Sequence, residues 1–153
     1  MGRLDEVEAL ALAEGDRWGW SYHLLKQTMI ELEKGNWEAA RAGLLKVLAV
    51  AEKYHDRRPI VFASNDLGQI ALRCDDLAEA WRRAEMAEHY SLEVGLRSYR
   101  AEALELLGDI LSRRGFSEQA AARYREAIDV YIAAGDAQRA GQVAVKLADV
   151  GAA

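Results

Sequence analysis

The chain has 153 residues, 51% of them apolar, with one proline, one cysteine and a formal net charge of −5 at pH 7. This composition argues against a disordered chain, and the acidic balance argues against a nucleic-acid-binding protein, which usually has a basic face. No apolar run approaches the ~20 residues of a membrane span. The acidic N-terminus lacks the pattern of a signal peptide, so we expect a cytoplasmic protein that binds neither nucleic acid nor membrane.

Amphipathic segments separated by short breaks predict an all-α chain of about eight helices. The expected helices cover residues 3–14, 17–34, 37–54, 58–74, 76–94, 97–114, 117–134 and 137–150. The breaks between them fall near Gly15, Gly35, Asp56, Asp75, Gly95, Gly115 and Gly135. Glycine just past a helix end adopts a left-handed cap without steric cost, so most of these breaks carry their own turn signal.

Polar residues at the expected helix starts predict N-caps. Asn36, Ser117 and Asp136 stand where a side chain can accept a hydrogen bond from the first turn. Asp76, with Glu79 three residues later, resembles a capping box.

A repeat of forty residues runs through the chain. Its clearest copy spans residues 101–134, where small residues at Gly108, Ala120 and Ala127 predict a close approach of two helices. Shifting that copy by forty places Leu67-Gly68 under Leu107-Gly108 and Ala80 under Ala120. One such unit cannot bury its apolar stripe alone, so we expect neighbouring units to stack.

The pattern of Leu-Gly, a Gly or Asp turn, and then Ala, aromatic, Ala resembles the tetratricopeptide repeat (TPR). Leu107-Gly108, Gly115, Ala120, Tyr124 and Ala127 carry this resemblance best, and it covers about residues 20–150. The period of 40 in place of 34 and the missing closing proline make it similar to long-helix variants of the family, including the repeats of bacterial regulators. The resemblance implies a right-handed superhelical solenoid of antiparallel helix pairs.

No linker or low-complexity run divides the chain, so we expect one domain over residues 1–153. The resemblance implies a concave groove that binds a peptide or protein without chemistry. The domain would comprise a half-repeat at 3–14, repeats at 17–54, 58–94 and 97–134, and a terminal capping helix at 137–150.

No set of residues suggests catalysis. His23, His55 and His89 lie more than thirty residues apart, which does not suit a metal site on one helix. Cys74 has no histidine beside it in sequence to activate it, and no glycine-rich phosphate loop is present. We therefore expect no enzyme, no catalytic residues, no metal and no cofactor.

The resemblance assigns the groove to the first helix of each repeat. The candidate groove residues are Trp18, Tyr22, Leu25, Met29, Phe62, Asn65, Gln69, Arg73, Glu102, Glu105, Asp109 and Arg113. The lysine and asparagine with which chaperone-binding members of the family hold a carboxylate are missing, which argues against a chaperone tail as the ligand.

These residues predict a ligand with an apolar anchor near Trp18, Tyr22 and Met29. Its lysine or arginine would face Glu102, Glu105 and Asp109, and its main chain would contact Asn65 and Gln69. Two alternatives stay open: the apolar residues pack beneath the N-terminal helix, or the acidic residues form an ordinary solvated face.

The final helix is unusually apolar for the end of a solenoid, which usually has a polar outer face. Val143, Val145 and Val150 are the candidate residues of a face for self-association or a partner helix. Three hypotheses for function follow: an adaptor that binds a protein or peptide, an assembly protein that associates through its terminal helices, and the sensor part of a larger bacterial regulator.

Overall fold

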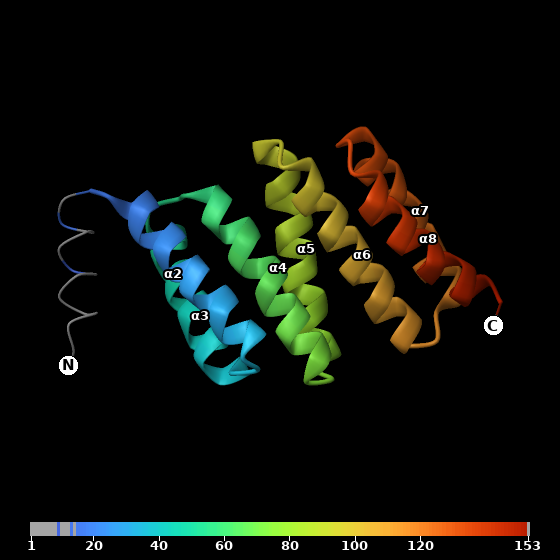
Figure 1. Cartoon of the computed structure of the whole chain (residues 1–153), viewed down its shortest axis with the longest axis horizontal. Coiled ribbons are helices and arrows are strands. Elements are labelled where there is room, and N and C mark those ends of the chain that lie inside the picture. Colours follow the sequence, from blue (N-terminus) through green and yellow to red (C-terminus); the bar gives the residue numbers. More distant parts are fainter. Residues whose placement is uncertain (1–8, 10–12, 14, 153) are drawn as a thin grey trace.

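The structure is a computed structural model and describes residues 9, 13 and 15–152. This part of the chain contains seven α-helices and no β-strand. Each helix packs against the next, and α4 also contacts α2 and α6, so the chain forms a row of helix pairs (Figure 1). The helices are α2 (Arg17–Glu33), α3 (Trp37–Lys53), α4 (Arg57–Arg73), α5 (Leu77–Val94), α6 (Arg97–Arg113), α7 (Ser117–Ala133) and α8 (Ala137–Gly151). The prediction of an all-α solenoid is confirmed.

Every expected helix from residue 17 onward is found with both ends within one residue of the predicted boundary. The helix expected over residues 3–14 lies outside the described residues, apart from residues 9 and 13.

The turns share one construction. A residue with positive φ occurs every twenty positions, at Gly15, Gly35, His55, Asp75, Gly95, Gly115 and Gly135. At Gly115, the glycine N–H donates to the carbonyl of Ser112 (3.0 Å), and the next N–H donates to the carbonyl of Leu111 (2.9 Å). The same pair of bonds recurs at positions 35, 55, 75 and 135. This is a Schellman motif, which satisfies carbonyls that the end of a helix leaves without partners.

The expected N-caps are confirmed in part. Asp76 and Asp136 accept hydrogen bonds from the N–H groups of Glu79 (3.1 Å) and Arg139 (3.0 Å). Asn36 occupies a cap position, but its amide donates to Glu31 (2.6 Å) instead of capping α3.

Two of the expected capping arrangements are wrong. Ser117 is the first residue of α7 and not its cap, because the turn around Gly115 places Phe116 at the cap position. The side chain of Glu79 does not close a capping box, because it binds Arg82 and Arg83.

The close approach of helices predicted at small residues is confirmed. Gly108 on α6 lies against the ring of Tyr124 on α7, where an added Cβ would stand 2.6 Å from Cε1. Ala120 and Ala127 on the same face of α7 are fully buried. Gly68, forty residues before Gly108, lies against the side chain of Leu106. Gly68 also approaches Ala80 and Arg83 on α5, so both glycines lie where their helix comes close to the next one in the chain.

Candidate functional site

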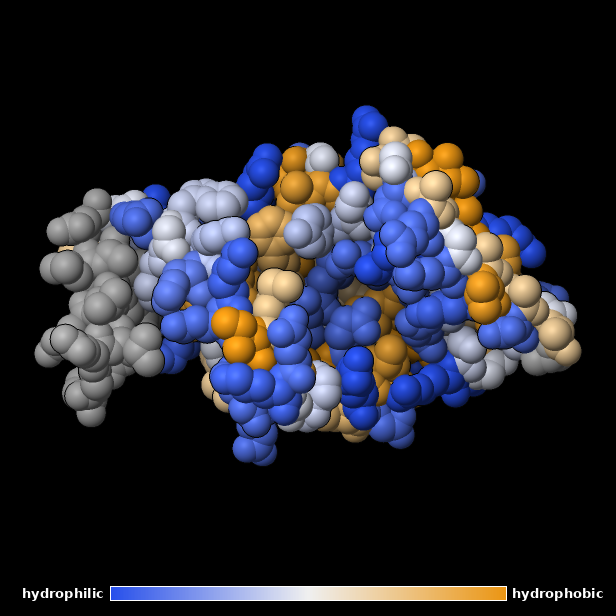
Figure 2. Space-filling model, in the orientation of Figure 1, coloured by the Kyte–Doolittle hydropathy of each residue, from blue (hydrophilic) through white to orange (hydrophobic). Residues whose placement is uncertain are grey.

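The helices α2, α4 and α6 border a hollow of about 560 Å³ on one face of the row. Its lining residues come from all three helices: Trp18, Tyr22, Leu25, Lys26, Met29, Leu32, Glu33, Phe62, Asp66, Tyr99 and Glu102. Figure 2 shows this face, with apolar surface over α2 and α4 lying between polar side chains. We call this site the hollow.

Three large apolar side chains of α2 form the apolar part of the hollow. Trp18 is 49% exposed, and Tyr22 and Met29 are each 55% exposed. Leu25 and Leu32 lie half-buried beside them, packed on the core between α3 and α4. An exposed apolar group gathered in one concavity marks a binding surface far more often than scattered exposed residues do. The structure therefore brings together all four residues predicted from α2.

An aromatic pair forms the centre of the hollow. The ring centroids of Phe62 on α4 and Tyr99 on α6 lie 4.6 Å apart, with the ring planes inclined at 52°. Tyr22, Phe62 and Glu102 stand at the same position of the forty-residue repeat, and all three line the hollow. Tyr99 was not among the predicted residues, because it lies a turn earlier on its helix.

Two carboxylates, Asp66 on α4 and Glu102 on α6, form the acidic part of the hollow. Burial raises the pKa of Asp66 to about 6. Burial also raises the pKa of Glu102 to about 7, reinforced by Asp66 and opposed by the charge of Arg139. Neither carboxylate makes a hydrogen bond or an ion pair with any other described residue. Both groups are held in a site that disfavours their charged form.

Asp66 was missed by the sequence analysis, because the repeat gives only a partial signal for it. It shares a repeat position with Lys26, Leu106 and Lys146, and three of these four residues are charged. Leu106 is fully buried and Lys146 binds Glu105 and Asp109, so the residues at this repeat position do not form one exposed stripe. Of the predicted groove residues, Leu25, Asn65 and Glu105 lie one position before it.

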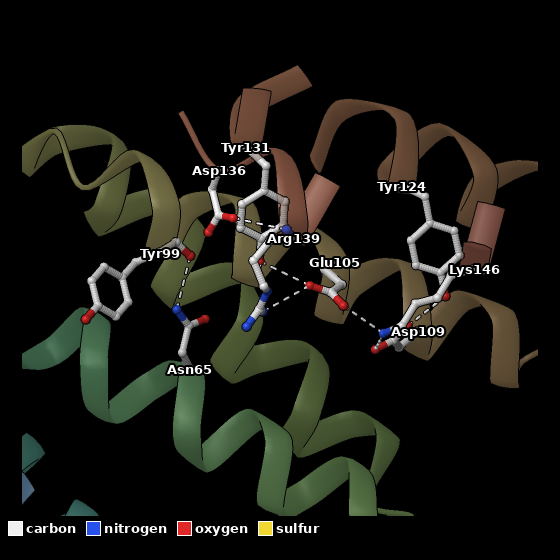
Figure 3. A network of polar contacts seen from close by, with 9 residues as sticks. All are labelled: Asn65, Tyr99, Glu105, Asp109, Tyr124, Tyr131, Asp136, Arg139 and Lys146. Carbon is white, nitrogen blue, oxygen red and sulfur yellow. Dashed lines mark hydrogen bonds and ion pairs between the residues drawn. The ribbon is translucent and has the colours of Figure 1, made fainter. Parts of the chain in front are cut away.

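Glu105 and Asp109, predicted to face a ligand, bind α8 instead. The ammonium of Lys146 lies 2.8 Å from Glu105 and 2.9 Å from Asp109, and the hydroxyl of Tyr124 donates to Asp109 (2.7 Å) (Figure 3). Although burial alone would lower the pKa of Lys146, its bonds to the two carboxylates raise it above its ordinary value. The expectation of a free acidic surface at these two residues is wrong, because Lys146 and Arg139 of the same chain pair with them.

Arg139 closes the same cluster. Its guanidinium lies 3.4 Å from Glu105 and 3.0 Å from the hydroxyl of Tyr131, which itself donates to Glu105 (3.1 Å). Burial and the nearby charge of Glu105 raise the pKa of Tyr131, so its hydroxyl stays protonated as a donor. The cluster joins α6, α7 and α8, and its role is structural.

The remaining predicted groove residues lie outside the hollow. Asn65 is 2% exposed and donates to the carbonyl of Tyr99 (3.1 Å), so its expected contact with a ligand main chain is wrong. Arg113 donates to the carbonyl of Leu72 (2.6 Å) at the end of α4. Arg73 stacks over Trp37, with its guanidinium carbon 4.8 Å from the ring centroid. Gln69 is exposed on α4 and is not among the lining residues.

Of the three residues on α8 that were predicted to form an association face, one is largely exposed to solvent. Val143 is fully buried, so the expectation that it belongs to an outer face is wrong, whereas Val150 is partly buried against the core. Val145 is 63% exposed. Lys146 and Arg139 point inward to α6, which leaves the outer side of α8 without these two charges.

In the part of the chain that the structure describes, no three histidine, cysteine, aspartate or glutamate residues are grouped to hold a metal ion. None of the described helices combines the length and apolar character needed to cross a lipid bilayer. No protein-family model matches the chain, and no curated protein matches it either.

Proposed function

We propose that the chain is a non-catalytic binding module of the TPR type that holds a peptide or a protein segment in the hollow. The observation that carries the proposal is the exposure of Trp18, Tyr22 and Met29 within one concavity. Each of these side chains keeps about half of its surface in water, and a partner could bury that surface. Aromatic and Met side chains contribute strongly to binding when an interface buries them.

The dimensions of the hollow suit a few side chains and not a whole domain. A volume of about 560 Å³ falls within the range of small-ligand sites, and it opens along three helices. A short segment could place one apolar anchor beside Tyr22 and continue toward Phe62 and Tyr99. Such an anchor supplies most of the affinity, because exposed charge pairs contribute only about 0–1 kcal/mol each.

The proposal is tested by selecting peptides from a random twelve-residue display library on the immobilised full chain. Peptides that bind the hollow are expected to lose at least about tenfold in affinity on a Tyr22→Ala, Met29→Ala double variant. A Leu92→Ala, Ile132→Ala double variant is the matched control, because both residues are exposed on other helices. Equal loss on both double variants, or no loss on either, refutes the hollow as the site.

A second candidate function is self-assembly through α8. The exposed Val145 and the inward turn of Lys146 and Arg139 favour it, because they leave a valine uncovered at the end of the row. A second copy stacking on this face would extend the solenoid in the same way that α7 and α8 extend α6. The two candidates use different faces, so either can hold without the other.

A further inference from the structure

The ligand chemistry of the hollow is set by an excess of negative charge. Three carboxylates line it, on Glu33, Asp66 and Glu102, against one cation, Lys26. The ammonium of Lys26 lies over the ring of Tyr22, 5.3 Å from its centroid, and makes no ion pair with the lining carboxylates. The hollow therefore attracts a positive group and repels a negative one.

No described residue donates a hydrogen bond to the two carboxylates in the acidic part of the hollow. Asp66 and Glu102 bond to no other described residue, and the buried Oδ1 of Asn65, next to Asp66 on α4, has no partner in that part of the chain either. The charge of Arg139 acts on Glu102, but one terminal nitrogen of its guanidinium bonds to Glu105 and Tyr131, and its buried Nε has no partner in the described part of the chain. Carboxylates removed from water without donors are costly, so a donor-rich cation would bind them favourably.

Aromatic faces beside these carboxylates favour a cation further. Tyr99 is 36% exposed and forms a tilted pair with Phe62, and Tyr22 borders the same space. A guanidinium or an ammonium over an aromatic ring is attracted by the negative face of the ring. Carboxylates and rings in one concavity are complementary to a side chain that has an aliphatic stem and a charged end.

We propose that this acidic part of the hollow, bounded by Asp66, Glu102 and Tyr99, receives an arginine or lysine side chain of the bound segment. The proposal rests on the proposed function and specifies its ligand: a segment with an apolar anchor beside Tyr22 and Met29 and a basic residue next to it. The basic residue pairs with carboxylates that form no ion pair with any other described residue, in contrast to Glu105 and Asp109.

The test uses the peptides selected on the full chain, each synthesised with its basic residue and with a neutral replacement. Citrulline replaces arginine and norleucine replaces lysine. With the wild-type chain, the replacement is expected to weaken binding at least about tenfold, as measured by titration calorimetry. With an Asp66→Asn, Glu102→Gln double variant, the replacement is expected to change affinity less than about threefold.

A Glu85→Gln, Asp129→Asn double variant is the matched control, because it removes the same charge from exposed positions on α5 and α7. It should retain the full preference for the basic peptide. Selected peptides that lack a basic residue, or an equal preference on the Asp66 and Glu102 variant, overturn the proposed ligand while leaving the hollow as a binding site. Failure of all peptides to distinguish wild type from the Tyr22 and Met29 variant overturns the proposed function itself.

Discussion

Replacing Glu102 with glutamine should stabilise the protein at alkaline pH and have little effect at acidic pH. The pKa of Glu102 rises from the ordinary 4.5 to about 7 in the fold because the carboxyl is buried. Between these values the folded chain binds more protons than the unfolded chain, so stability falls as pH rises and levels off above pH 7. Relative to a glutamate with the same pKa in both states, the raised pKa lowers the free energy of unfolding by about 3 kcal/mol at pH 8 and by about 1 kcal/mol at pH 5.

Because Glu102 keeps some contact with water, we expect the measured loss of stability at pH 8 to be about 2 kcal/mol. The assay is urea unfolding followed by circular dichroism, for wild type and Glu102→Gln, at pH 5 and pH 8. The free energy of unfolding of the variant should exceed that of wild type by about 1–1.5 kcal/mol more at pH 8 than at pH 5. Glu85→Gln, on the exposed side of α5, is the control and should track wild type. A difference between Glu102→Gln and wild type that stays constant with pH would refute the reasoning.

Three further changes test the helix contacts, the turns and the terminal face. Gly108→Ala should lower the free energy of unfolding by about 1–3 kcal/mol, since the new methyl group would meet the ring of Tyr124. Gly141→Ala should raise the free energy of unfolding by about 0.5–1 kcal/mol, because alanine favours the helix and its methyl group would meet no other atom. His55→Gly should add about 1 kcal/mol in urea unfolding, because it removes a side chain from a left-handed turn; no gain would contradict that account. Val145→Glu should abolish any concentration-dependent growth in mass seen by light scattering, and a wild-type chain that stays monomeric at roughly tens of micromolar would exclude self-assembly.

The helices were predictable because their signals are local. Glycine or aspartate at a turn specifies the end of the helix just before it. Small residues such as Gly108 mark helix contacts because they recur at the same position of the repeat. The site was predictable only in part. The TPR resemblance placed Tyr22, Phe62 and Glu102 in the groove, and all three line the hollow. Glu105 and Asp109 were assigned in the same way, but they meet Lys146 from a helix about forty residues later. Tertiary contacts decide which carboxylates form ion pairs with cations of other helices, and the repeat pattern does not predict those contacts.

The uniform turn also makes whole helix pairs interchangeable. Asp56 and Leu96 stand at the same point of matching turns, so joining residue 56 to residue 97 would remove α4 and α5 without requiring a new loop conformation. The shortened chain would keep Trp18, Tyr22 and Glu102 but lose the aromatic centre and one carboxylate of the hollow. Gain or loss of forty residues at these joints therefore offers an evolutionary route to a new ligand in a single step, because the recognition surface is rearranged while the joints stay the same.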